Sequence, residues 1–203
     1  MNYLAHLLLA GEDPEEKLGA LMGDFTRGRL ENLARQYPPG IMQGIAVHRR
    51  IDIFTDRHHR FMQSKARFSK TRRRYAGIIV DIAYDHFLSR HWDQFSMIDR
   101  RKFISDVYGL LERNHHRLPE RLQRASTLMI TQDWLGSYHH IDRIGEVYDR
   151  MSRRLRRPNT LTGSLEEVRE HYPDLERDFA GFFPALVDHT QSVVVTSGLS
   201  GSN

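Results

Sequence analysis

Apolar residues recur at helical spacing along most of this chain, and glycine or proline interrupts the pattern at short intervals. The clearest stripe contains Leu18, Leu21, Met22 and Phe25, at positions i, i+3, i+4 and i+7 of one helix face. A strand is suggested only by the short apolar run at residues 193–195. The pattern therefore predicts an all-α fold, with helical segments at residues 2–10, 14–27, 41–52, 74–92, 99–117, 119–135, 137–156 and 164–189.

The length of 203 residues suits one domain with a sizeable core, because single hydrophobic cores commonly extend to about 200 residues. No internal repeat divides the chain. Its last residues are small and polar, which is typical of a flexible tail. We therefore predict a single-domain helical bundle over residues 1–192 and a flexible tail over residues 193–203.

The chain contains no cysteine, which excludes disulfides, thiolate metal sites and cysteine nucleophiles. Its apolar start has neither the basic region nor the small-residue cleavage site of a secretory signal. No stretch approaches the roughly 20 apolar residues that cross a bilayer. These features predict a cytoplasmic protein without membrane insertion.

Two pairs of potential metal ligands stand four residues apart, namely His48 with Asp52 and Asp81 with Asp85. Residues with this spacing lie on one face of a helix, so each pair can direct two ligands toward a common point. Asp24, beside the apolar stripe of an earlier helix, can supply a further carboxylate ligand from a third side of the site. Imidazole and carboxylate ligands suit Mn²⁺, Mg²⁺ or Fe²⁺ and, less selectively, Zn²⁺. We therefore predict a metal site built from these five residues.

Isolated aspartates and histidines are more often surface or structural groups, so each candidate has an alternative. Asp81 lies in an apolar stretch, where an uncompensated carboxylate is costly, and this favours a functional role. His86 points about 100° away from its neighbour on the helix, which makes it a flanking ligand or an acid–base group. His6 is expected to be a buried structural histidine unless it lies near Asp24. Asp56 either extends the site or caps a helix.

Residues 57–74 contain eight basic side chains and no acidic one. The run joins the two helices that carry the ligand pairs, so we predict that it forms one rim of the active-site mouth. There it would attract an acidic partner or a polyphosphate, with Arg72, Arg73 and Arg74 as the partner-binding residues. The alternative is a solvated basic loop.

Two further arginines, Arg49 and Arg50, directly follow His48. A planar guanidinium can clamp two phosphate oxygens while a metal acts on the same group. We therefore predict that Arg49, and less directly Arg50, contacts a phosphate. The alternative is an exposed charged turn with internal salt bridges.

Four motifs together resemble those of a known family. They are Asn2–Leu7 (NYLAHL), Gly23–Gly28 (GDFTRG), Gly44–Asp52 (GIAVHRRID) with the following Thr55–Asp56, and Asp81–Trp92 (DIAYDHFLSRHW). Their order and spacing resemble the acyl carrier protein phosphodiesterases, also called acyl carrier protein hydrolyases, and weaker similarity continues to about residue 190. That family is similar to the helical HD-type metal-dependent phosphohydrolases, which bind metal through histidine and aspartate. The adjacent acidic and histidine residues are in the order Asp85-His86 here, which departs from the H…HD…D order of those enzymes.

The resemblance implies hydrolysis of the phosphodiester that joins 4′-phosphopantetheine to a serine of acyl carrier protein. It also implies an HD-like fold, an acidic protein as substrate and Mn²⁺ as cofactor, with Mg²⁺ or Fe²⁺ as alternatives. A metal can polarise the phosphoryl oxygen and lower the pKa of bound water, while arginines balance the phosphate charge. Arg49, His86 and His6 are then the candidate catalytic groups.

Two other functions fit parts of the sequence. An HD-like hydrolase of nucleotides or other small phosphate esters would use the same metal site without a protein partner. A non-enzymatic helical nucleic-acid binder would explain the net charge of +4 and the arginine run, but it leaves the ligand pairs without a purpose. Phosphate-loop, dinucleotide-binding and nucleophile-elbow motifs do not occur. We therefore expect an enzyme without a nucleic-acid partner.

Overall fold

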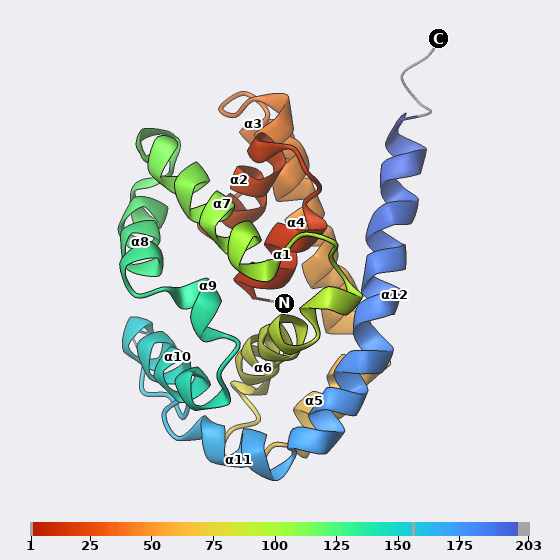
Figure 1. The fold of residues 1–203 in the computed structure, drawn as a ribbon, viewed down its shortest axis with the longest axis vertical. Coiled ribbons are helices and arrows are strands. Elements are labelled where there is room, and N and C mark those ends of the chain that lie inside the picture. The colour runs from red at the N-terminus through yellow and green to blue at the C-terminus, as the bar shows by residue number, and fades with distance from the viewer. Residues whose placement is uncertain (1, 156, 199–203) are drawn as a thin grey trace.

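A computed structural model describes residues 2–155 and 157–198, with the backbone alone at residue 154 and residues 192–198. Over this part of the chain there are helices and loops but no strands, so the predicted all-α fold is confirmed (Figure 1). None of these helices combines the length and apolarity needed to cross a bilayer. With η marking short 3₁₀ helices, the elements are α1 Tyr3–Leu9, α2 Pro14–Met22, η1 Gly23–Phe25, α3 Leu30–Leu33, α4 Pro39–Arg57, α5 His59–Arg67, α6 Ala76–Arg90, η2 Trp92–Gln94, α7 Arg100–Arg113, η3 His115–Arg117, α8 Glu120–Thr131, α9 Trp134–Ser137, α10 Ile141–Arg154, α11 Ser164–Glu170 and α12 Tyr172–Gly198.

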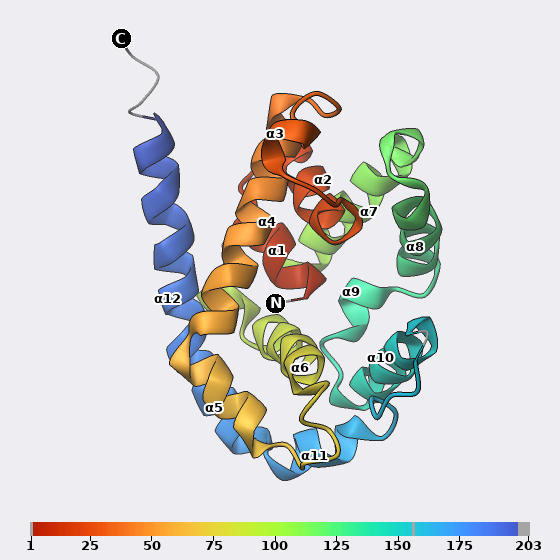
Figure 2. The same cartoon turned by 180° about the vertical axis from the view of Figure 1, so that it is seen from behind.

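The helix α6 runs through the middle of the bundle and packs against α1, α5, α10, α11 and α12 (Figures 1 and 2). From Ile79 to Ser89 only Asp81 is not fully buried. A helix that is buried around nearly its whole circumference is expected at the centre of a fold. The buried apolar side chains of α6 belong to one continuous core that extends from α1 to α12.

The helices α2 and α4 cross at close range because glycine stands on both sides of the contact. A Cβ atom at Gly19 would overlap the carbonyl oxygen of Ile41, and one at Gly44 would overlap that of Glu16. Larger residues would therefore force the two helices apart. This contact holds the end of α2, and η1 after it, beside the middle of α4.

Two predicted helices are divided in the structure. The segment 119–135 becomes α8 and α9, separated at Asp133, whose φ of 46° lies in the left-handed region and whose side chain accepts a hydrogen bond from the Gly136 backbone N–H at 3.1 Å. The segment 164–189 becomes α11 and α12, with a break at His171. In both cases the apolar spacing continues across a local turn, so spacing alone does not reveal the break.

The end of the chain differs from the sequence prediction. The apolar run 193–195 is helical and not a strand, because it continues α12. The predicted tail therefore begins inside this helix, which extends to Gly198. Residues 199–203 of the predicted tail lie outside the described residues.

Candidate active site

Two histidines and two aspartates meet where α1, α4 and η1 converge, and we call His6, Asp24, His48 and Asp52 the histidine–aspartate cluster. The two carboxylate oxygens of Asp52 lie 3.3 Å from His6 Nε2 and 3.2 Å from His48 Nε2. The same His48 nitrogen lies 3.5 Å from Asp24 Oδ1. The predicted His48/Asp52 pair thus shares one helix face, and Asp24 and His6 join it from two other elements.

Three of the four residues in the cluster hold donor atoms that are close enough to share one cation. One ligand atom each from His6, His48 and Asp52 lies within 4.8 Å of the others. The two imidazole rings stack with their centroids 3.9 Å apart and an angle of 19° between them, so both Nε2 atoms face the same carboxylate. His48 Nδ1 is buried without a hydrogen-bond partner. Two imidazoles and one carboxylate are a common ligand set for a divalent metal.

The side chains of the cluster have shifted pKa values, and the shifts show which charges the site stabilises. Burial alone would lower the pKa of His48, but hydrogen bonds to Asp24 and Asp52 outweigh it and raise that pKa to about 9. Burial would raise the pKa of Asp52, yet its contacts with both histidines hold it well below its usual range. His6 is more deeply buried, which lowers its pKa to about 4. The pocket between the carboxylates therefore favours a positive charge.

A glycine makes room for the His48 ring. A Cβ atom at Gly23 would overlap the Cγ and Cδ2 atoms of this ring. Gly23 is the first residue of η1, directly before Asp24, so the absence of a side chain lets η1 lie against α4. The sequence motif contained this glycine, but spacing along the chain did not reveal its contact with His48.

The structure gives Asp85 a different setting from the predicted metal site. Its side chain is fully buried and accepts hydrogen bonds from the backbone N–H groups of Leu4 at 2.7 Å and Ala5 at 3.2 Å. Burial raises the pKa of Asp85 to about 7, although these two hydrogen bonds act in the opposite direction. Asp85 therefore caps the first turn of α1 and helps to fix the helix that carries His6.

His86 also lies outside the cluster. Its Nδ1 is 2.7 Å from the carbonyl oxygen of Tyr138, and its Nε2 is 2.8 Å from the hydroxyl of Tyr172. A carbonyl can only accept, so Nδ1 carries the proton and Nε2 accepts from the tyrosine. Burial lowers the pKa of His86 to about 4, which keeps it neutral in this network. These contacts join α6 to the segments before α10 and at the start of α12.

A cavity of about 760 Å³ opens beside the histidine–aspartate cluster. Asp24 and Asp52 line it, together with two other acidic residues, Asp56 and Asp81. Burial of the Asp81 carboxylate raises its pKa, and the nearby charges of Asp52 and Asp56 act in the same direction. Asp81 thus faces the same cavity as the cluster, whereas Asp85, one turn later on α6, is used to cap α1.

The opposite wall of the cavity was not found from the sequence. It includes Arg121, Arg124, Ala125 and Leu128, all from α8. These residues are spaced i, i+3, i+4 and i+7, which is one face of a helix. That spacing was visible in the sequence, but no motif connected α8 with the ligand-bearing segments.

Arg49 and Arg50 on α4 were predicted to bind phosphate. Neither is among the described residues that line the cavity. Arg49 donates a hydrogen bond of 2.8 Å from Nη1 to the carbonyl oxygen of Gly28. This bond fastens the loop after η1 to α4. Arg50 is half-buried on the same helix. Their contact with phosphate stays a prediction.

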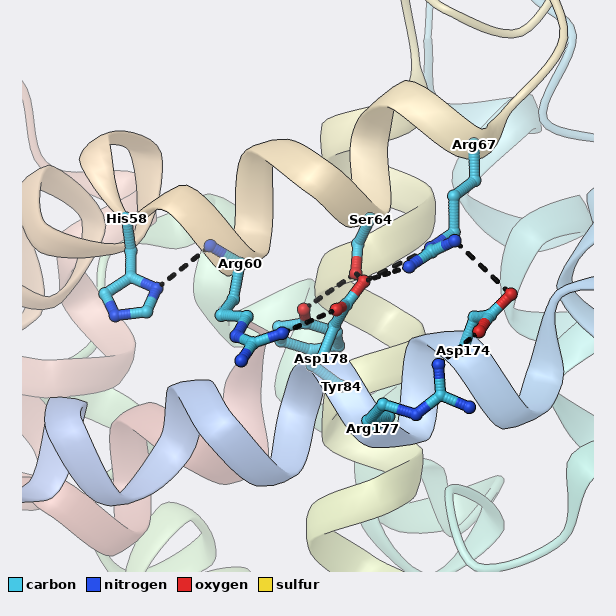
Figure 3. Close-up of polar contacts among 8 residues, drawn as sticks. All are labelled: His58, Arg60, Ser64, Arg67, Tyr84, Asp174, Arg177 and Asp178. Atoms are coloured by element: carbon cyan, nitrogen blue, oxygen red, sulfur yellow. Dashed lines mark hydrogen bonds and ion pairs between the residues drawn. The ribbon is translucent and has the colours of Figure 1, made fainter.

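Several basic residues in the run 57–74 are used inside the fold. Figure 3 shows the contact between α5 and α12, where Asp178 is 1 % exposed and accepts hydrogen bonds from Ser64 at 3.0 Å and from Arg67 Nη2 at 3.0 Å. Arg60 Nη1 lies 3.7 Å from the other Asp178 oxygen, and Arg67 also pairs with Asp174 at 3.3 Å. This part of the basic run therefore joins two helices.

The three predicted partner-binding arginines divide into two kinds. Arg72 donates to Glu167 at 2.7 Å and to the carbonyl oxygens of Thr160 and Thr162, so it fastens the segment before α6 to the loop before α11. Arg73 and Arg74 are exposed. Of the three arginines, only Arg73 and Arg74 are exposed enough for a partner protein to contact them.

Comparison with known proteins gives a consistent result over nearly the whole chain. The family model described as acyl carrier protein phosphodiesterase matches residues 1–186. A protein named acyl carrier protein phosphodiesterase from Photorhabdus laumondii is 36% identical over 193 residues, covering 95% of this chain and 96% of the relative. Proteins of the same name from Serratia proteamaculans and Yersinia pestis are 35% and 34% identical over 192 residues, each covering 94% of this chain and 98% of the relative. No solved structure gives a significant match.

Proposed function

This chain belongs to the acyl carrier protein phosphodiesterase family, and we propose that the histidine–aspartate cluster is its catalytic centre. The protein is a hydrolase that removes the prosthetic group from acyl carrier protein. Water attacks the phosphorus atom, the bond from phosphorus to the serine oxygen breaks, and the serine oxygen receives a proton. The products are apo-acyl carrier protein and 4′-phosphopantetheine. The observation that supports the assignment is the convergence of His6, His48 and Asp52 at the edge of an acidic cavity.

The donor set fits a divalent metal, and we propose Mn²⁺, with Mg²⁺ or Fe²⁺ as alternatives. His6, His48 and Asp52 would hold it, with Asp24 and Asp81 as flanking carboxylates. The orientation of both Nε2 atoms toward the Asp52 carboxylate, with further carboxylates at Asp24 and Asp81, supports a cation here. When bound, the metal supplies Lewis-acid polarisation of the phosphoryl oxygen and of the attacking water. The relation to HD-type enzymes stays a prediction.

The chain's own residues prepare the site in two ways. The cap that Asp85 forms on α1 and the close contact of Gly23 with His48 hold the two imidazoles in their stacked arrangement. The carboxylates of Asp24 and Asp81 line the cavity where the attacking water must lie, and each can accept a hydrogen bond from that water. Fixed donors and acceptors of this kind lower the cost of reorganisation during the reaction.

The protein substrate must approach this cavity, and we propose that Arg73 and Arg74 contribute to its docking. They are exposed and precede α6, whose residues Ile78, Asp81 and Ile82 line the cavity. An acidic carrier protein would gain in encounter rate from positive charge at this rim. The cytoplasmic location expected from the sequence stays a prediction.

The test is incubation of the protein with holo-acyl carrier protein and Mn²⁺, followed by mass spectrometry of the carrier protein. We expect the mass to fall to that of the apo form, and we expect EDTA to prevent the change and added Mn²⁺ to restore it. A nucleotide and a small phosphodiester serve as alternative substrates. Hydrolysis of these without any change in the carrier protein would contradict the proposal and favour an enzyme of small phosphate esters.

A further inference from the structure

The face of α8 that borders the cavity is basic at its start and apolar further along. Arg121 and Arg124 lie toward its start, and Ala125 and Leu128 follow on the same face. Leu128 is 44% exposed, which is unusual for a large apolar side chain in this fold. The face therefore presents two positive charges and then an apolar surface to the cavity.

The cavity needs positive charge on this wall if it is to hold a phosphodiester. Asp24, Asp52, Asp56 and Asp81 all line it, and a phosphate that approaches four carboxylates is repelled unless cations offset them. A single metal offsets only part of this charge. Arg49 is fastened to the Gly28 carbonyl and does not line the cavity, and among the described residues that line it the basic side chains are Arg121 and Arg124 of α8.

The two α8 arginines are accessible for this purpose. Within the described residues Arg121 forms no ion pair and its side chain is exposed. Arg124 pairs with Glu120 one turn earlier, and its side chain is 66% exposed. An exposed i,i+4 pair of this kind contributes at most about 0.5 kcal/mol, so it is easily exchanged for a phosphate contact.

The apolar part of the wall continues onto α10. Met151 near the end of α10 and Leu155 directly after it line the cavity, as do Ile78 and Ile82 of α6. The volume of about 760 Å³ is within the range of about 300–1,000 Å³ that is typical of small-molecule sites. A flexible chain with an anionic head and apolar groups along its body fits this order of side chains.

We propose that Arg121 and Arg124 bind the phosphate of the substrate and that the apolar strip beside them, including Leu128, receives the pantetheine arm. This proposal rests on the function proposed above. It places the scissile phosphate between two walls, with the histidine–aspartate cluster on one side and the α8 arginines on the other. The carrier protein then remains outside the cavity.

The experiment measures binding of free 4′-phosphopantetheine and of inorganic phosphate to the Mn²⁺-loaded protein by isothermal titration calorimetry. We expect Arg121→Gln and Arg124→Gln each to weaken binding of both ligands by roughly tenfold, as loss of a charge-assisted hydrogen bond predicts. Leu128→Ala should weaken binding of 4′-phosphopantetheine by roughly threefold and leave phosphate unaffected. Arg101→Gln, at an exposed arginine on α7, is the matched control and should change neither.

Wild-type affinity of both arginine variants for both ligands would overturn the proposal. Equal weakening of the two ligands in Leu128→Ala would overturn the placement of the arm. Hydrolysis of holo-acyl carrier protein by the wild type is measured in the same series, so failure of the enzymatic function is seen separately. The binding measurement does not depend on turnover, and it therefore decides the role of α8 even if the protein does not cleave the carrier protein.

Discussion

The histidine–aspartate cluster and the contact between α5 and α12 both contain a carboxylate held by basic side chains, but they differ in how completely it is satisfied. Asp178 is 1% exposed and contacts Ser64, Arg60 and Arg67, so its charge is matched within a closed interface (Figure 3). The Asp52 side chain is 44% exposed and faces a cavity that three further carboxylates line. The first arrangement needs no further ligand, whereas the second favours a cation.

The comparison shows why charge along the sequence is a poor guide to function in this protein. The run 57–74 has eight basic residues and no acidic one, yet Arg60, Arg67 and Arg72 are used to join helices. Arg121 and Arg124 belong to no such run, yet they border the cavity. A charge is available for function where the fold leaves it unpaired within the described residues, as at Arg121, or in a weak and exposed ion pair, as at Arg124.

The largest expected effect is on catalysis at Asp52. Asp52→Asn removes the carboxylate that both histidines contact, and even loss of a group that only hydrogen-bonds to a metal ligand commonly costs about 10–100-fold in metal affinity or activity. We therefore expect turnover of holo-acyl carrier protein to fall by more than about a hundredfold, with little change in the melting temperature. Full activity with unchanged Mn²⁺ content would remove Asp52 from the centre.

The converse is expected at Asp178. Asp178→Asn weakens the attraction for Arg67 and Arg60, and the partly exposed arginines can recover some hydration, so we expect a loss of about 2–3 kcal/mol in unfolding free energy. Urea denaturation measures it, and activity of the folded fraction should stay near wild type. If this variant instead lost activity without losing stability, the distinction between the two clusters would fail.

A pH-dependent stability effect is expected at His86. Its pKa is about 4 in the fold, against a usual 6.5, so the unfolded chain binds the proton more readily between these values. The stabilising contribution is complete above pH 6.5 and is lost as the pH falls toward 4, amounting to about 3 kcal/mol. Thermal unfolding at pH 7 and pH 4.5 measures this loss.

In His86→Gln the decrease in melting temperature between these two pH values should be smaller than in wild type. Asp85 titrates in the opposite direction because its pKa is raised, so the informative quantity is the difference between variant and wild type. The exposed His59 provides the control through His59→Gln. An identical pH dependence in His86→Gln and wild type would show that the buried histidine is not the source.

The smallest effect is expected at the exposed part of the basic run. Arg73→Glu with Arg74→Glu should raise KM for the carrier protein a few-fold at low salt and flatten its salt dependence, because the Debye length falls from about 10 Å at 0.1 M to about 3 Å at 1 M. Arg101→Glu on α7 is the charge-matched control. Unaltered kinetics across salt concentrations would place docking elsewhere on the surface.

Arg72 sharpens this last test. Arg72→Glu places a second acidic side chain beside Glu167 and removes the hydrogen bonds to the loop before α11. We therefore expect it to lower the melting temperature, unlike the changes at Arg73 and Arg74. A triple reversal of all three arginines would combine the two effects and could not separate docking from folding.

Local spacing was enough to predict the helical class and half of the candidate centre. The four-residue interval between His48 and Asp52 required only that the segment be helical, since helix geometry then places both on one face. The apolar stripes likewise predicted α2, α4 and α6. The same reasoning could not separate Asp81 from Asp85, because both lie on a helix that is buried on nearly every side.

Contacts between distant segments were decided by the tertiary structure alone. His6 joins the cluster because Asp85, about 80 residues away, caps α1, and His48 fits because Gly23 has no side chain. Arg121 faces the acidic wall because α8 packs on the far side of the cavity. The sequence by itself determined most of the helical segments and the faces that they bury, since these depend on neighbours a few residues apart. Which side chains share a site depended on how those helices pack, and packing joins residues whose separation along the chain carries no periodic signal.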